Sequence, residues 1–88
     1  MKFNIDDLKK KIIYRATYRG TKEMDKLLSS FTKKYIQTFN YNELNDLSDL
    51  LDFEDEDLYK FNQGEEILNK INVNKVTELF KNFIYKSE

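Results

Sequence analysis

The segment that decides how this chain folds is YRATYRGTKEMD, residues 14–25. It contains Gly20, one of two glycines among 88 residues, and the whole chain lacks proline. Glycine often takes the left-handed conformation that closes a helix, so the segment predicts that a first helix ends near Arg19 and Gly20. The apolar spacing resumes at Met24, which predicts a second helix. We therefore expect a tight corner between two helices.

Apolar residues recur at helical spacing on both sides of this corner and along most of the chain. No alternating strand pattern competes with them. We therefore predict an all-α fold, a small bundle of about five helices that forms a single domain over residues 1–88. The expected apolar faces are Ile5, Leu8, Ile12 and Ala16; Met24, Leu27, Leu28, Phe31 and Tyr35; Leu44, Leu47, Leu50 and Leu51; Leu58 and Phe61; and Val76, Leu79, Phe80, Phe83 and Ile84.

Helix ends are predicted from capping and turn residues. The second helix should end around residues 37–40, and the fourth should begin within the acidic run 52–57 and fade by Gly64. Asparagine is a preferred N-cap, so Asn40 or Asn42 should cap the third helix and Asn72 or Asn74 the last. Three further apolar residues either extend the fourth helix or form a separate turn: Ile67, Leu68 and Ile71.

The composition excludes most catalytic machinery. The chain has no histidine, cysteine or tryptophan, so no Ser-His-Asp or Cys-His triad can form and the commonest zinc ligands are missing. The lack of cysteine also excludes disulfides and favours a reducing compartment. We predict no catalytic residue, no metal site and no bound cofactor, and a small enzyme that relies on paired carboxylates is the least favoured class.

Charge is unevenly distributed along the chain. Residues 1–39 carry ten Lys or Arg against four Asp or Glu, whereas residues 40–66 carry one against ten. This polarity either orients the domain against a partner or belongs to an ordinary solvated surface, and the sequence leaves both open. The acidic run does not fit a calcium loop, because the sixth residue from Asp52 is Asp57 instead of glycine and the twelfth is Gln63 instead of glutamate.

Nucleic acid and membranes are not expected partners. Lys9, Lys10 and Lys11 point in three directions around a helix, and the net charge of the chain is −1. No apolar run is long enough to enter a membrane. Residues 1–7 lack the features of a signal or transit peptide, which leads us to expect a bacterial cytoplasmic location.

The corner at residues 14–25 has a structural and a functional interpretation. Structurally, Gly20 ends a helix, Glu23 suits the positive start of the next helix, and Arg19 suits the negative end of the first. Functionally, exposed Tyr and Arg are the residue types that anchor protein interfaces, and several crowd this corner. The predicted partner-binding residues are Arg19, Gly20, Glu23, Tyr14, Arg15, Tyr18 and Asp25.

The same corner carries a family resemblance. Residues 12–25, followed by Leu27, Leu28 and Phe31, resemble the SdhE family of FAD assembly factors, called succinate dehydrogenase assembly factor 2 in mitochondria. The family signature Arg-Gly-x-x-Glu is matched by Arg19, Gly20 and Glu23, and similar spacing continues through Leu50-Leu51, residues 55–61 and Gly64. The resemblance covers roughly residues 8–66. Three departures are Phe61, where the family usually has Trp, Thr21, where it often has Met, and Ile12, where it commonly has Arg.

The resemblance implies a function without enzymatic activity. It implies a chaperone that binds the flavoprotein subunit of succinate dehydrogenase, or of fumarate reductase, and promotes covalent attachment of FAD to a histidine of that subunit. Arg19 and Glu23 would pair with charged groups of the partner, and Gly20 would permit close backbone approach. We expect the free chain to be a monomer. The alternative is an antitoxin-like or regulatory protein-interaction domain.

Overall fold

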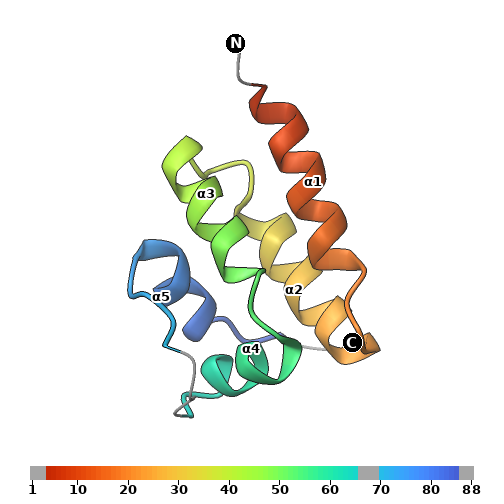
Figure 1. The fold of residues 1–88 in the computed structure, drawn as a ribbon, viewed down its shortest axis with the longest axis vertical. Helices are drawn as coiled ribbons and strands as arrows, with labels where there is room; N and C mark the ends of the chain where they lie inside the picture. The colour runs from red at the N-terminus through yellow and green to blue at the C-terminus, as the bar shows by residue number, and fades with distance from the viewer. Residues whose placement is uncertain (1–3, 66–69, 86–88) are drawn as a thin grey trace.

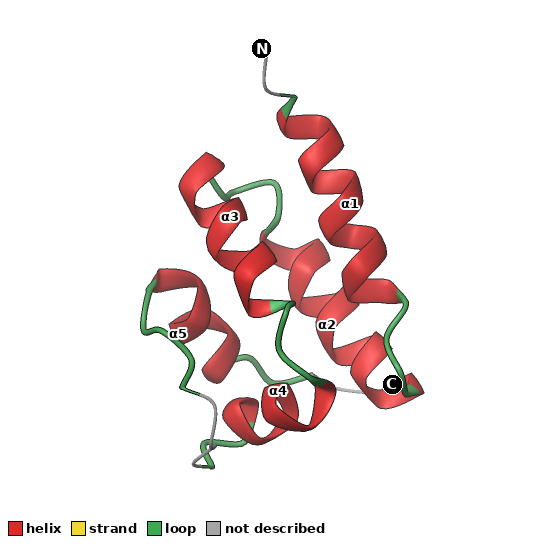
Figure 2. Ribbon diagram, viewed as in Figure 1, coloured by secondary structure: helices red, strands yellow, loops and turns green. Residues whose placement is uncertain are grey.

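The computed structural model describes residues 4–65 and 70–85, and these ranges contain five helices. They are α1 (Ile5–Thr17), α2 (Lys22–Tyr35), α3 (Tyr41–Leu50), α4 (Asp55–Asn62) and α5 (Lys75–Lys81). Figure 2 shows helices and loops, and no strand, in the described part of the chain. The predicted all-α fold with five helices is confirmed. Ile67 and Leu68 lie outside the described residues.

The helices pack as a small bundle with α4 across one end. Figure 1 shows α1 and α2 side by side, α3 next to them, and α5 beside α3. The loop between α1 and α2 and the loop between α3 and α4 lie at the same end of the bundle, near the start of α4. Two segments far apart in the sequence, residues 18–21 and 51–54, are therefore neighbours in space.

A single cluster of apolar side chains joins the five helices. Phe31 of α2 is fully buried and meets the rings of Phe80 and Phe83 edge to face, at centroid distances of 5.2 and 5.4 Å. Each fully buried Leu or Phe side chain stabilises the fold by about 1.5–3 kcal/mol. The buried apolar residues are Ile12, Ala16, Met24, Leu27, Leu28, Phe31, Ile36, Phe39, Leu44, Leu47, Leu50, Leu51, Leu58, Ile71, Val76 and Phe80.

Local capping fixes where the helices begin. Asn40 caps α3 and Asn74 caps α5, each accepting from a backbone N–H three residues ahead. The structure thus selects Asn40 over Asn42 and Asn74 over Asn72. Two ends differ from prediction because the helical backbone stops earlier: α2 ends at Tyr35, before residues 37–40, and α5 ends at Lys81, before Phe83 and Ile84.

The prediction of a left-handed Gly20 is wrong. Helix α1 ends at Thr17, its C-cap is Tyr18, and among the described residues a positive φ occurs at Gly64 alone, with a value of 79°. Gly20 therefore does not take the left-handed conformation. A reason for glycine at this position has to be sought in its surroundings.

Candidate partner-docking site

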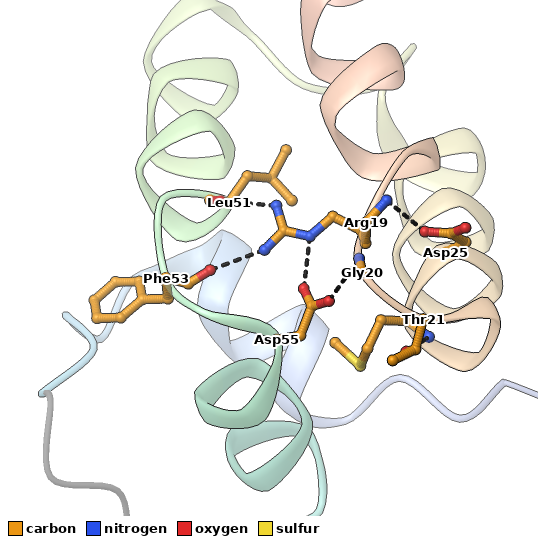
Figure 3. Close-up of polar contacts among 8 residues, drawn as sticks. Arg19, Gly20, Thr21, Asp25, Leu51, Phe53 and Asp55 are labelled. Atoms are coloured by element: carbon orange, nitrogen blue, oxygen red, sulfur yellow. Dashed lines mark hydrogen bonds and ion pairs between the residues drawn. The ribbon is translucent and has the colours of Figure 1, made fainter.

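Arg19 is the central side chain of the corner between α1 and α2, and it points into the molecule. Its Nε donates to Asp55 Oδ1 at 2.7 Å, Nη1 to the Leu51 carbonyl at 2.9 Å, and Nη2 to the Phe53 carbonyl at 2.8 Å. Figure 3 shows the guanidinium reaching from the first loop to the loop between α3 and α4. The Arg19 side chain is 13% exposed. Each of its three nitrogens thus has a partner within the chain.

Carboxylates hold the backbone of the same corner. The Asp25 carboxylate accepts the backbone N–H of Arg19, and Asp55 Oδ2 accepts the backbone N–H of Gly20 at 3.0 Å. Thr21 caps α2 by accepting the N–H of Met24 at 3.2 Å. Hydrogen bonds to a charged acceptor are roughly twice as strong as neutral ones, so these contacts fix the path of residues 19–21.

A second arginine ties α1 to the end of α3. Arg15 Nη1 donates to Ser48 Oγ at 2.8 Å, and Nη2 forms an ion pair with Asp52. Asp52 is largely exposed, so this pair is accessible to water and weaker than the Arg19 pair. Together the two arginines connect the first helix with the acidic segment that follows α3.

Two tyrosines face outward from the same end of α1. The Tyr14 side chain is 65% exposed and Tyr18 68% exposed. Their rings contact each other at a centroid distance of 4.7 Å with tilted planes. A pair of exposed aromatic rings offers apolar surface to a partner, and aromatic side chains lose little conformational entropy on binding because they have two χ angles.

Glu23 also faces solvent. It lies in the first turn of α2 and is exposed, and its carboxylate forms no hydrogen bond or ion pair among residues 4–65 and 70–85. It lines an open groove of about 790 Å³ between α2, α4 and the segment after α5. Leu27, Tyr59 and Tyr85 are among the other side chains of this groove. The carboxylate is therefore available to a partner.

Comparison with known proteins identifies the family. The sequence model of the family described as "Flavinator of succinate dehydrogenase" matches residues 10–84. The chain belongs to this family. The resemblance predicted from residues 12–25 is thereby confirmed. No solved structure matches the chain at a significant level.

Curated relatives of this flavinator family member cover part of its length. One from Debaryomyces hansenii is 39% identical over 56 residues, which is 64% of this chain and 39% of that protein. One from Scheffersomyces stipitis is 45% identical over 49 residues, which is 56% of this chain and 33% of that protein. One from Saccharomyces cerevisiae is 38% identical over 55 residues, which is 62% of this chain and 34% of that protein. Each is named "Succinate dehydrogenase assembly factor 2, mitochondrial". The matches extend over a third to two fifths of their length.

The seven residues predicted to bind a partner fall into two groups in this family member. Tyr14, Tyr18, Gly20 and Glu23 are exposed, and we call them the docking face. Arg15, Arg19 and Asp25 make contacts within the chain, and we call them the inner frame. The expectation that Arg19 points toward a partner differs from the structure, because two carbonyls and a carboxylate of the loop before α4 surround its guanidinium.

Sequence reasoning missed Asp52 and Asp55 as members of the corner. The signal was present in the charge distribution, since the basic first segment and the acidic middle segment were already identified. The structure brings these two segments together through Arg15–Asp52 and Arg19–Asp55, and Glu43 of the acidic segment pairs with Lys75. Lys75 comes from the last helix. Part of the charge polarity is thus used for pairing inside the molecule, an interpretation that the sequence alone did not offer.

No group of metal-ligating side chains occurs in the described ranges 4–65 and 70–85. Within the same ranges, none of the helices has the length and apolarity to cross a bilayer.

The pKa of the Glu43 carboxyl is lowered. The backbone N–H of Asn40 donates to this carboxyl and lowers its pKa, and Lys75 lowers it further. This carboxyl belongs to the α3 cap and lies outside the docking face.

Proposed function

We propose that this chain is an assembly factor that binds the flavoprotein subunit of succinate dehydrogenase and promotes covalent attachment of FAD to it. The observation that carries the proposal is the match of residues 10–84 to the flavinator family. The exposed Tyr14, Tyr18 and Glu23 beside a corner fixed from within support it. The flavoprotein subunit of fumarate reductase is a second partner of the same kind.

In this proposal the chain acts by positioning. The inner frame holds the corner in one conformation before the partner arrives, so less conformational freedom is lost on binding. The tyrosine pair and Glu23 then contact the flavoprotein where its domains meet. Glu23 supplies the charge that meets a basic group of the partner, and Arg19 acts by holding the corner. Fixing the partner's domains keeps its acceptor histidine and the flavin in reacting geometry.

The chemistry of attachment comes from the partner. The chain has no histidine or cysteine that could form a bond to a flavin, and no glycine-rich phosphate loop. The proposal therefore assigns the acceptor histidine and the FAD site to the flavoprotein. A monomeric state of the free chain, a single domain over residues 1–88 and a bacterial cytoplasmic location stay predictions.

The first test is Glu23→Ala with the flavoprotein subunit co-expressed. The Glu23 carboxylate is exposed and makes no hydrogen bond or ion pair in the described ranges, so its removal should cost only its interaction with the α2 N-terminus, about 0.3–1 kcal/mol. We expect the chain to stay folded and covalent flavin to be lost, measured by in-gel flavin fluorescence of the partner. Glu78→Ala is the matched control, because Glu78 is an exposed carboxylate in the first turn of α5. It should leave flavin attachment at the wild-type level.

A combined variant would contradict the proposal if it still promoted flavin attachment at the wild-type level. Glu23→Ala together with Tyr14→Ala and Tyr18→Ala removes three side chains of the docking face. Wild-type flavin fluorescence with this variant would show that the corner has no role in attachment. A pull-down distinguishes the alternative class: recovery of cytoskeletal proteins instead of a flavoprotein would support a regulatory domain.

A further inference from the structure

Asp55 contacts both the side chain and the backbone of the corner. It lies in the first turn of α4, 30 residues or more from the corner in sequence. Its Oδ1 accepts Arg19 Nε at 2.7 Å, and its Oδ2 accepts the Gly20 N–H at 3.0 Å. Both oxygens are thus used, and the side chain is 24% exposed. One carboxylate therefore connects α4 with two consecutive residues of the docking corner (Figure 3).

The same carboxylate explains the glycine at position 20. A Cβ added to Gly20 would lie 3.2 Å from Asp55 Oδ2, closer than such atoms usually approach. The carboxylate cannot easily withdraw, because Arg19 holds its other oxygen and is itself held by the Leu51 and Phe53 carbonyls. Since the φ of Gly20 is not positive, the close approach of Asp55 supplies a physical reason for glycine here.

We propose that Asp55 is the positioning residue of the docking face. Its carboxylate sets the conformation of residues 19–21, and through them the placement of Tyr18 and Glu23 toward the flavoprotein. This inference rests on the proposed function for the identity of the partner. The requirement for Gly20 is then a requirement for space beside Asp55. The sequence had suggested a different reason, close backbone approach to the partner.

Asp55→Asn tests the proposal with little change in shape. An amide can accept from one of the two donors, but its NH₂ group then faces the other donor. Glu54→Gln is the matched control, because it removes the same charge from the adjacent residue, which makes no side-chain cap bond. The purified chain gives an internal reference, since its two glycine amide signals belong to Gly20 and Gly64.

The expected result has two parts. Hydrogen exchange of the Gly20 amide, measured by ¹H–¹⁵N spectroscopy, should become about tenfold faster in Asp55→Asn because a charge-assisted bond is lost. Exchange at Gly64 should stay constant. Binding of the purified flavoprotein subunit should weaken by about tenfold or more, since the docking face is no longer held in place. Glu54→Gln should change neither quantity.

The possible failures are distinct. Unchanged Gly20 exchange in Asp55→Asn overturns the positioning role, and weakened binding alone would instead make Asp55 a direct contact. Faster Gly20 exchange with unchanged binding overturns it as well. If the wild-type chain neither binds the flavoprotein nor raises its covalent flavin, the proposed function fails, while the Gly20 measurement still decides whether Asp55 sets the corner.

A double-mutant cycle separates the two reasons for glycine. Gly20→Ala should weaken flavoprotein binding about tenfold in the wild-type background and add little in the Asp55→Ala background, where the crowding atom is gone. If Gly20→Ala costs the same in both backgrounds, glycine is needed for approach of the partner and the Asp55 explanation is wrong.

Discussion

The two glycine turns of this chain are built on different principles. The turn at Gly64 is local. The glycine has a φ of 79°, its N–H donates to the Phe61 carbonyl, and the N–H of Glu65 donates to the Lys60 carbonyl. The φ of Gly20 is not positive, and its turn is held by Asp55 from another helix. One glycine is needed for its conformation and the other for the space that it leaves.

This difference separates a turn that ends a helix from a turn that shapes a surface. Among residues 4–65 and 70–85, nothing lies within 4 Å of a Cβ added at Gly64, so none of these residues packs against that position. At the Gly20 turn the partners come from two helices, Asp25 of α2 and Asp55 of α4, and their bonds fix the loop between Tyr18 and Glu23. A fixed surface is what a protein that acts by positioning requires.

The largest effect is expected when the tertiary turn loses its arginine. Arg19→Ala leaves the Asp55 carboxylate and two carbonyls without their donor in a partly buried setting, and should lower the free energy of unfolding by about 3 kcal/mol. Urea unfolding followed by circular dichroism measures this. Arg15→Ala is the control, because its pair with Asp52 is more exposed and should cost about 1 kcal/mol or less. Equal losses would contradict the distinction between an enclosed pair and an exposed one.

A smaller effect is expected at the local turn. Gly64→Ala places a side chain in the left-handed region, which should cost about 1 kcal/mol of stability. Gly64→Asn should recover part of it, because asparagine tolerates this conformation. Neither variant should change covalent flavin on the partner. If Gly64→Ala abolished flavin attachment while the chain stayed fully folded, the local turn would also shape the docking face.

The smallest effect concerns Glu43, which belongs to a helix cap and pairs with Lys75. The Asn40 N–H, and then Lys75, lower its pKa below the ordinary value of 4.5. The stabilisation by this carboxylate is therefore complete above pH 4.5 and is lost as the pH falls through the lowered pKa of the folded state. Glu43→Gln should make the stability of the chain less dependent on pH in that acid range, measured by urea unfolding at several pH values.

Loss of that dependence without a change in flavin attachment at neutral pH would place Glu43 outside the docking function. If Glu43→Gln lowered flavin attachment at neutral pH while the chain stayed folded, the contact between α3 and α5 would also have to contribute to the docking face. Lys75→Gln is the companion variant. It should shift the same pH dependence by less, because the backbone bond of Asn40 is the larger cause of the lowered pKa.

Several features of the fold could be predicted because they depend on residues close in sequence. The helical spacing of Leu44, Leu47 and Leu50 predicted α3, and all three side chains are buried. Capping by Asn40 follows from a side chain three residues before the N–H that it accepts. The end of α2 was placed too late, because Ile36 and Phe39 continue the apolar spacing beyond Tyr35 and are buried although the helix has ended.

The candidate site was predicted in its location and only partly in its arrangement. Tyr14, Tyr18 and Glu23 were expected at an exposed corner, and they are exposed. The inward orientation of Arg19 could not be predicted, since its acceptors are carbonyls of Leu51 and Phe53. A backbone carbonyl has no signature in the sequence. The partner of such a guanidinium becomes visible when the loops are folded together.

The sequence by itself determined the helical class, the pairs of asparagines from which two caps were chosen, the family signature at Arg19, Gly20 and Glu23, and the lack of histidine and cysteine. These follow from spacing, composition and contacts over a few residues. The tertiary structure decided which charges hold the corner and which face outward, and why position 20 is glycine. The physical reason is that Asp55 meets the corner across more than thirty residues of chain, a contact that exists after the helices have packed around their common core.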